Sequence, residues 1–263
     1  MQNGLKFLMG MLIVLSTSLM AKELHNSYSL ALVGMSMDYK EYDPQLVDSE
    51  KSTFTDVGGF EMAYGYLLSN QSKINFSAMY VRGYTDYVGS AIGRSNPYGS
   101  LTSRTRNNIV DIALSYARYK ELNYGLTLDY GAGVGYRYWE RTLSSIQNEL
   151  YDWFSLRTRI GVTKEISNQF AFNIGAEYQY GIKPNMHASS VGTDFTLGSA
   201  DILKGNLGLI YSYSPKIDIF MDASLEKQTI ETSNIVSVGG IGYYEPDSTA
   251  YNTYLKFGVT FKY

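Results

Sequence analysis

The sequence contains no cysteine and only two histidines among its 263 residues. Without cysteine the chain cannot form disulfide bonds, a thiolate metal site, a thiol nucleophile or a cysteine-linked lipid anchor. Two histidines also leave little imidazole for metal binding or acid–base chemistry. Thiol enzymes and disulfide-rich secreted domains are therefore excluded.

Charge and long apolar runs are also scarce. Charged residues make up 18% of the chain, and 22 Lys and Arg against 25 Asp and Glu give a net charge of −3. A duplex phosphate backbone would meet no electropositive surface, so nucleic acid is not an expected partner. After residue 21, no stretch approaches the roughly 18 consecutive apolar residues of a membrane-spanning helix.

The first 21 residues have the features of a secretory signal. Lys6 precedes an apolar run of nine residues from Phe7 to Leu15, and a polar stretch then leads to the small residue Ala21. A transmembrane anchor needs about 20 apolar residues to cross the bilayer. We predict that residues 1–21 are a signal peptide removed on export, and that residues 22–263 form one domain.

Aromatic residues are abundant, and from residue 27 to the end the hydrophobic pattern alternates with a period of two. The chain has 25 Tyr, 11 Phe and 2 Trp. In the segment 124–138, apolar side chains at even positions alternate with Gly, Thr, Asp and Arg at odd positions. The segments 170–183 and 217–226 show the same pattern. Such alternation predicts β-strands with one apolar face and one small or polar face.

The chain divides into ten such segments, joined by connections of alternating length. Four short turns begin at residues 69, 120, 167 and 214, spaced 51, 47 and 47 residues apart, which indicates a repeat of hairpins. All five prolines are expected in loops or turns. The predicted strands are 27–41, 53–68, 73–86, 106–119, 124–140, 150–164, 170–183, 202–213, 216–228 and 251–263. The predicted long loops are 42–52, 87–105, 141–149, 184–201 and 229–250.

The predicted strands are too long for a soluble β-sandwich. They run 12–17 residues, whereas strands of soluble proteins average about five to six and a tilted membrane strand needs at least about nine. Tyr124 and Tyr136 lie at opposite ends of one apolar face, roughly 28 Å apart along a tilted strand, which is close to the spacing of aromatic girdles. A sheet in hydrocarbon must close, because every backbone donor and acceptor needs a partner. We therefore predict an all-β fold, a closed antiparallel transmembrane β-barrel of about ten strands with short periplasmic turns and long extracellular loops.

The last strand ends on an aromatic residue. Phe257, Val259, Phe261 and Tyr263 alternate with small or polar residues up to the final position. This pattern resembles the C-terminal strand by which bacterial outer-membrane proteins are recognised by the barrel-assembly machinery, although Phe is the usual last residue. The resemblance implies the outer membrane of a Gram-negative bacterium, with outer-membrane lipid and the assembly machinery as partners.

If the apolar faces contact lipid, the other faces enclose seven acids and five bases. Such mixed charges predict a paired network that braces a narrow barrel, since an unpaired buried charge is unfavourable. Gly131, Gly133 and Gly135 leave a thin inner wall, so a narrow channel or a ligand pocket remains an alternative. The predicted lumen-facing residues are Glu61, Asp111, Asp129, Arg137, Arg157, Arg159, Glu177, Lys204, Asp218, Asp222, Glu226 and Lys256.

The remaining polar patterns predict no cofactor and no metal. The segment from Gly131 to Gly135 lacks the final glycine and the helix of a phosphate-binding loop, so it is interpreted as strand interior. Asp48, Glu50 and Asp56 lie in or beside the first long loop without the spacing of a cation site, and we expect them to be solvated. Arg82 falls on the apolar face of its strand, where we expect it to reach toward the membrane interface.

Ten strands, five long outer loops and termini on the periplasmic side resemble the omptin family of outer-membrane proteases. The resemblance implies an Asp–His pair on one wall of the barrel rim and an Asp pair opposite, which together activate a water molecule. His187 falls in the fourth long loop, where the family keeps its catalytic histidine. Asn185 stands where the family has Asp, however, and residues 89–105 contain no Asp. We therefore predict that the protein is not an enzyme and that His187 is an ordinary loop histidine.

The leading functional hypothesis is a non-enzymatic barrel with a mostly filled lumen, whose five extracellular loops form an interaction or adhesion surface. The alternatives are a narrow, porin-like channel for small solutes and an omptin-like protease. The expected partner is accordingly an extracellular ligand or a small solute. Within the loop 229–250, the apolar residues Ile235, Val236, Val238 and Ile241 indicate an extended hairpin or a lid over the mouth.

Overall fold

The computed structural model describes residues 24–43, 45–90 and 97–263. In these ranges the chain is almost entirely β-structure, with one 3-10 turn at Asn123–Gly125. No helix in the described ranges is long and apolar enough to cross a membrane. The predicted signal peptide, residues 1–21, lies outside the described residues. The strands are β1 (Ser27–Asp43), β2 (Gln45–Lys51), β3 (Val57–Ser69), β4 (Ser72–Gly89), β5 (Leu101–Leu122), β6 (Leu126–Thr142), β7 (Asn148–Glu165), β8 (Phe170–Ala188), β9 (Thr193–Thr196), β10 (Ala200–Ser214), β11 (Ile217–Ile230), β12 (Val236–Val238), β13 (Ile241–Tyr243) and β14 (Asp247–Lys262).

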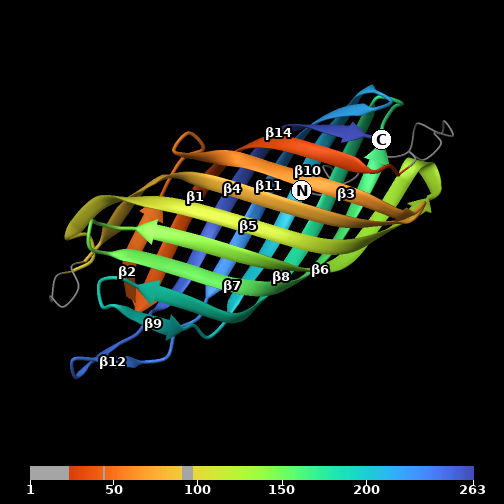
Figure 1. Cartoon of the computed structure of the whole chain (residues 1–263). Coiled ribbons are helices and arrows are strands. Elements are labelled where there is room, and N and C mark those ends of the chain that lie inside the picture. Colours follow the sequence, from red (N-terminus) through yellow and green to blue (C-terminus); the bar gives the residue numbers. More distant parts are fainter. Residues whose placement is uncertain (1–23, 44, 91–96) are drawn as a thin grey trace, which may run out of the picture.

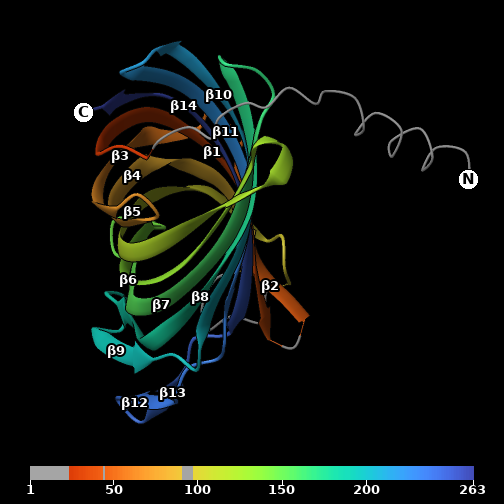
Figure 2. The same ribbon diagram turned by 90° about the vertical axis from the view of Figure 1, so that its right-hand side faces the viewer.

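Ten long strands form one closed ring. They pair antiparallel in the order β1, β3, β4, β5, β6, β7, β8, β10, β11, β14, and β14 pairs with β1 to close the ring. The closing ladder runs from Ser27 opposite Lys262 to Tyr42 opposite Asp247. Figures 1 and 2 show these strands running obliquely around a common interior. Each of the ten strands has an antiparallel neighbour on both sides, and the predicted closed transmembrane β-barrel is confirmed.

All ten predicted strands are present, but the predicted positions of one short turn and one proline are wrong. The second short turn lies at Asn123–Gly125 rather than at 120–123, because β5 continues until Leu122 pairs with Leu126. Pro184 lies inside β8 and not in a loop. The residue before it, Lys183, has a φ of 48°, and the β7–β8 register shifts at this point. Proline is tolerated there because a bulged residue does not need to donate to the ladder.

Toward the short-turn end, the outer surface carries large apolar side chains. Leu114, Ile174 and Phe257 are exposed on this surface, while interior positions on the same strands carry residues such as Asp111 and Lys256. The last strand contributes Phe261 and Tyr263 in the same way. An exposed band of aliphatic and aromatic side chains is the lipid-facing surface of a membrane barrel.

Toward the long-loop end, the alternation inverts along the strands. On β1, Leu32 is exposed on the outer face, and Asp38 lies on the same face six residues further along. On the inner face, Ser29 lies near the short-turn end, and the fully buried Met35 and Met37 lie further along. Outside the bilayer the outer surface meets water, so the apolar side chains turn to the inside. The strands therefore continue beyond the membrane and enclose an apolar core of their own.

Arg82 on β4 marks the same inversion. Phe76 faces outward near the short-turn end of β4, and Arg82 lies six residues further along on the same outer face. Val81, next to Arg82, is fully buried in the interior. Arg82 therefore stands where the strand has left the lipid-facing band, which accounts for a charge on an otherwise apolar face.

Three of the predicted long loops contain strands at the extracellular end. β2 folds back beside β1 and pairs with both β1 and β4. β9 folds back onto the end of β8, and β12 and β13 form a separate hairpin. Figure 2 shows β9 at the extracellular end of the long strands and the β12–β13 hairpin beyond it. The loop predictions at 42–52 and 184–201 are wrong to this extent, since backbone pairing with neighbouring strands continues past the membrane. The extended hairpin expected within 229–250 is confirmed by β12 and β13.

Candidate functional site

The barrel interior is crossed at mid-height by a network of buried charges, called here the central network and made of Asp111, Arg137, Arg157 and Glu226. Arg137 Nε donates to Asp111 Oδ2 over 2.9 Å, and Arg137 Nη1 donates to Glu226 Oε1 over 2.8 Å. Arg157 Nη1 donates to Asp111 Oδ1 over 2.8 Å. These residues come from β5, β6, β7 and β11, on opposite walls of the ring. The central network therefore ties the walls together across the lumen.

Arg157 reaches Asp111 by lying over Gly135. In the ladders, Asp111 pairs with Arg137 on β6, and Arg157 pairs with Gly133 on the same strand. A Cβ at Gly135 would lie 2.1–2.3 Å from the Arg157 guanidinium. The guanidinium therefore fills the space that Gly135 provides, whereas Gly133 lines an interior cavity.

The other predicted lumen residues also face the interior, mostly in separate pairs. Lys256 binds Glu61 over 2.5 Å and Arg159 binds Asp129 over 2.7 Å. Lys262, which the sequence analysis did not select, binds Asp218 over 2.8 Å. The direct contacts of the remaining three are with neutral groups: Glu177 accepts from Gln179, Asp222 accepts from Asn206, and Lys204 lies over the ring of Tyr254.

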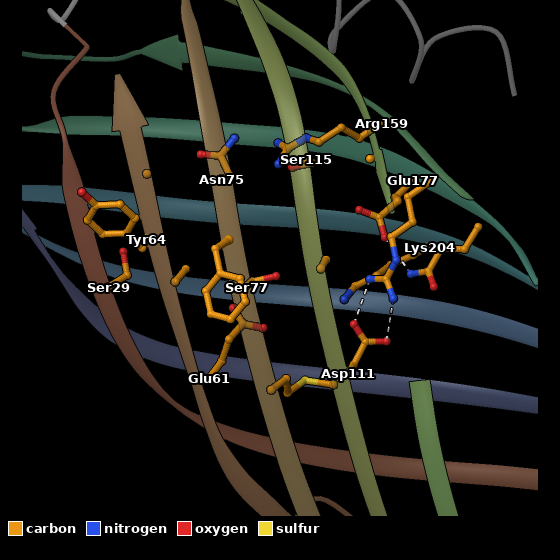
Figure 3. A pocket seen from close by; sticks show the side chains of 18 of the residues that line it. Ser29, Glu61, Tyr64, Asn75, Ser77, Asp111, Ser115, Arg159, Glu177 and Lys204 are labelled. Atoms are coloured by element: carbon orange, nitrogen blue, oxygen red, sulfur yellow. Dashed lines mark hydrogen bonds and ion pairs between the residues drawn. The ribbon is translucent and has the colours of Figure 1, made fainter. Parts of the chain in front are cut away.

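A cavity of about 330 Å³ occupies the periplasmic half of the interior. It is lined by polar residues that include Glu61, Asn75, Arg159, Glu177 and Lys204, which Figure 3 shows around it together with Asp111. On the other side of Arg137, the space between Met37, Trp139 and Asn252 has no room for a water molecule. The cavity therefore ends at the central network.

Beyond the central network, the interior is filled by apolar and aromatic side chains. Met35, Met37, Trp139, Trp153 and Ile202 are among its fully buried members. Trp139 stacks on Tyr151 with ring centroids 5.2 Å apart, and Tyr39 meets Trp139 edge-on at 5.3 Å. Among the residues that the structure describes, packing of this kind fills the extracellular half of the interior.

The mouth of the barrel holds a second buried cluster, called here the mouth cage. It consists of Arg141, five carboxyl groups and the hydroxyl groups of Tyr39 and Tyr151. Arg141 Nη1 donates to Glu41 over 2.7 Å and to Glu149 over 2.8 Å, and Nη2 donates to Glu50 over 2.8 Å. The guanidinium also lies over the Tyr39 ring, 4.2 Å from its centroid. The carboxyl groups of the cage are Glu41, Asp48, Glu50, Glu149 and Glu245.

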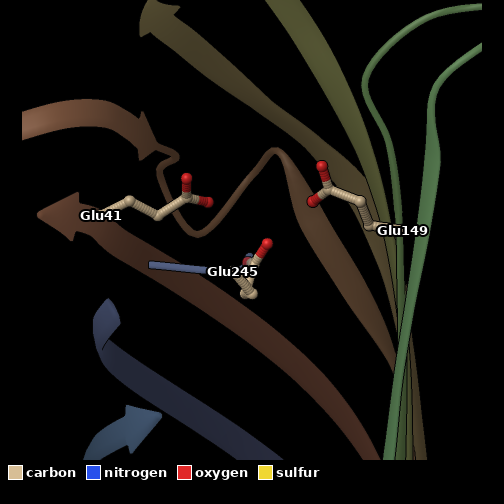
Figure 4. A group of neighbouring side chains, drawn as sticks. All are labelled: Glu41, Glu149 and Glu245. Atoms are coloured by element: carbon tan, nitrogen blue, oxygen red, sulfur yellow. The ribbon is translucent and has the colours of Figure 1, made fainter. Parts of the chain in front are cut away.

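Three carboxylates of the mouth cage converge from different elements. Figure 4 shows Glu41 on β1, Glu149 on β7 and Glu245 before β14 pointing toward one another. Each offers an oxygen within 4.8 Å of the others. Arg141 lies between Glu41 and Glu149 and hydrogen-bonds to both, so the group is an ion-paired cage around a guanidinium. Tyr151 donates a hydrogen bond to Glu245.

Burial raises the pKa of several carboxyl groups in the mouth cage. Burial, with the nearby charges of Glu41 and Glu149 as smaller causes, holds the pKa of Glu245 well above its usual range. Burial also raises the pKa of Glu149, against the lowering effect of Arg141. Asp48 has its pKa raised to about 7, mainly by burial and then by Glu41. The cage therefore holds protons more tightly than exposed carboxylates do.

The mouth cage was not predicted from the sequence. Glu50 was predicted to be solvated, but it is fully buried on β2 beneath Arg141, because β2 pairs with β1 and β4 in place of forming a loop. Asp56 is only partly exposed, between β2 and β3, where it accepts a hydrogen bond from Thr53. The sequence does contain a signal for the cage, because the inner and outer faces of the strands exchange polarity where the strands leave the membrane. Beyond that point apolar residues occupy the inward positions, and Arg141 lies in line with them and not with the lipid-facing residues.

His187 lies on a strand and faces outward. Its neighbours Met186 and Ala188 are buried in the apolar core, while His187 is exposed. His187 Nδ1 lies 2.7 Å from Asp194 Oδ1 on β9. Asn185 pairs with Thr196 in the same ladder. The His187–Asp194 pair therefore lies on the outer face of the wall, away from the barrel interior.

The ring of strands resembles solved outer-membrane proteins. The crystal structure of the outer membrane protease OmpT from Escherichia coli matches with a TM-score of 0.61 and 11% identity, over 94% of this chain and 99% of that one. OprG from Pseudomonas aeruginosa matches with a TM-score of 0.41 and 10% identity, over 93% and 99% of the two chains. Ail of Yersinia pestis matches with a TM-score of 0.33 and 14% identity, over 90% and 100%. No family model matches the sequence, and no curated protein matches it.

At 11% identity, the likeness to OmpT shows the fold alone. The chain has an outer-membrane β-barrel fold, as its closed ring and apolar outer band require. Within this fold, apolar side chains fill the interior beyond the central network, and the strands extend beyond the apolar outer band.

Proposed function

We propose that this protein is a non-enzymatic barrel of the Gram-negative outer membrane that presents its extracellular end as an interaction surface and does not conduct solutes. The observation that carries the proposal is the filled interior. The central network and the apolar core beyond it separate the periplasmic cavity from the extracellular mouth. A barrel filled in this way supports structure outside the membrane and does not leave a pore.

The β12–β13 hairpin is the part of the surface best suited to contact a partner. The 13 residues from Thr232 to Tyr244 contain no charged residue. Ile235 and Ile241 are largely exposed, and Tyr244 is exposed beside them. Asn234 ties this segment to Thr196 on β9 through two hydrogen bonds. An exposed apolar patch on a fixed support is typical of an interaction site.

The first experiment measures conductance. Purified protein is reconstituted into planar bilayers, with a known porin as the positive control. We expect no steady single-channel steps at protein densities where the porin conducts, since the described side chains of the central network and the apolar core fill the interior. Regular steps would support the channel alternative and contradict the proposal.

The second experiment measures binding by the surface. Cells that display the wild type are compared on arrays of glycans and matrix proteins with cells in which residues 236–243 are replaced by two glycines. A partner that binds the wild type and is lost with the hairpin supports the proposal. Equal binding by both displays, at equal surface expression, contradicts a role for the hairpin.

A non-enzymatic role is supported by the outward position of His187 and by Asn185 at the position where omptins carry Asp. A peptide-cleavage assay tests this role directly. We expect no cleavage by the wild type. Cleavage that disappears in His187→Ala would instead support a protease on the outer rim.

A further inference from the structure

The segment between β11 and β14, residues 231–246, is called here the strap. Its two ends are held together, because Ser233 N donates to Glu245 O over 3.0 Å and Glu245 N donates to Ser233 Oγ over 2.8 Å. The strap carries the β12–β13 hairpin on its outer side. On its inner side it places the Glu245 side chain in the mouth cage, near Glu41 and Glu149 (Figure 4). Tyr151 on β7 donates a hydrogen bond to Glu245 there. Glu245 therefore links the strap to the far wall of the barrel.

Acidic groups outnumber basic groups in the mouth cage. Five carboxyl groups surround the single guanidinium of Arg141. The lysines on the neighbouring strands, Lys40 and Lys51, pair with Asp38 on the outside. The groups that face the cage are Tyr39 and Glu41 from β1, Asp48 and Glu50 from β2, Thr85 and Tyr87 from β4, Asn107 from β5, Arg141 from β6, Gln147 before β7, Glu149 and Tyr151 from β7, and Glu245 from the strap.

The hydrogen-bond donors of the cage are distributed unequally. Arg141 donates hydrogen bonds to Glu41, Glu50 and Glu149. Glu50 also accepts from Thr85 and Asn107. The buried Glu245 carboxyl accepts a hydrogen bond from the Tyr151 hydroxyl, which is a neutral donor. A buried carboxylate with such weak solvation is unfavourable, and binding a proton removes the penalty.

We propose that the mouth cage is a proton-operated clasp: protons held on its excess carboxyl groups keep Glu245 fastened to Tyr151, and their loss at higher pH detaches the strap and frees the hairpin. Ionised Glu245 would face the charges of Glu41 and Glu149 across a few ångströms without a cation of its own. Tyr151 and Arg141 favour the ionised form, but burial and this repulsion outweigh them and supply the force for release.

The direction of the pH effect follows from the raised pKa values in the cage. The pKa of Glu245 lies well above its usual range, and that of Asp48 is about 7. The closed cage therefore binds more protons than the open cage, where these groups return to their ordinary pKa values. Closure is favoured while the pH lies below the raised values and weakens as the pH rises through them.

The chain supplies its own probes for this clasp. Its two tryptophans, Trp139 and Trp153, both lie in the core directly beneath the mouth cage. Because the chain has no cysteine, Val238→Cys at the hairpin creates a single site for a spin label. The test follows label mobility and tryptophan fluorescence from about pH 5 to about pH 9 in wild-type and Glu245→Gln backgrounds. Heat-dependent gel mobility confirms that each variant is folded.

We expect the label to become at least about threefold more mobile between the lowest and highest pH, together with a reversible change in fluorescence. Glu245→Gln, which can still accept from Tyr151 but cannot ionise, is expected to keep the label immobile at every pH. Glu231→Gln, on an exposed side chain of the same strap, should behave like the wild type.

Three outcomes would overturn the clasp. The first is a label whose mobility does not change with pH. The second is a pH response that persists unchanged in Glu245→Gln. The third is a transition that follows added calcium or a chelator at constant pH, which would assign the cage to a metal ion in place of protons. None of these outcomes depends on whether the hairpin binds a partner, so the clasp and the proposed function fail separately.

Discussion

At the scale of single residues, ion pairs in the barrel interior form where a small residue leaves room for a large charged side chain. Arg157 can reach Asp111 because Gly135 on the intervening strand has no side chain. Sequence reasoning placed these residues on the inner face, but strand alternation carries no information on which charges meet across the lumen. Arg137 and Glu226 are 89 positions apart and come together only because the ring closes.

Gly135→Ala tests this use of space. The new Cβ would overlap the Arg157 guanidinium, so Arg157 must move away from Asp111. We expect a loss of about 1–3 kcal/mol in the free energy of unfolding, measured by urea titration in detergent. Gly205→Ala is the control, because a Cβ at Gly205 meets no atom nearer than 4.0 Å. Equal stability of the two variants would show that the Arg157–Asp111 contact is dispensable.

Arg141→Gln tests the electrostatics of the mouth cage. The change leaves buried carboxyl groups without their cation, and we expect it to destabilise the protein by at least about 3 kcal/mol near neutral pH. Without Arg141 these carboxyl groups must keep protons, so the variant should lose stability as the pH rises from about 5 to about 8 more steeply than the wild type. Thermal unfolding at both pH values measures this. Arg104→Gln, at an exposed arginine, should change neither value appreciably.

At the scale of strands, alternation located all ten long elements because the lipid-facing band gives a strong period-two signal. The same reasoning failed at the extracellular end, where inward and outward faces exchange polarity. A strand that leaves the membrane keeps its geometry but changes its solvent, so Val81 turns inward where Arg82 turns outward. The short strands β2 and β9 could not be predicted, since their pairing depends on neighbours distant in the sequence.

The position of this boundary can be measured on β5. Leu114 faces outward in the apolar band, and Asn108 faces outward six residues further along, where it donates to Glu140. Leu114→Arg is expected to reduce the free energy of folding into lipid vesicles by about 2–4 kcal/mol, and Asn108→Arg by less than about 1 kcal/mol. Similar losses at both sites would mean that lipid reaches further up the strand than the apolar band indicates.

At the scale of the whole molecule, the sequence predicted a closed barrel because an open sheet in lipid would leave backbone groups unpaired. The ladder between β1 and β14 provides that closure. The interior could not be predicted to the same depth. Alternation shows which residues face inward, whereas the filling of the extracellular half depends on the fit of side chains from every strand.

Closure itself has a simple test. A ring without free edges resists SDS at room temperature and unfolds on boiling, so the unheated and boiled samples should migrate differently on a gel. Deletion of residues 247–263 removes β14 and with it the closing ladder, and we expect this variant to lose the difference. A wild type with identical mobility in both samples would contradict the closed ring.

The inversion of polarity along the strands has a mechanical consequence. The ladders that anchor the molecule in lipid also build the part that stands in the medium, with no flexible linker between the two. A force applied to the outer end by a bound surface would therefore pass directly along stiff hydrogen-bonded strands into the bilayer. Along these ladders the exterior part therefore cannot swivel relative to the part in the membrane.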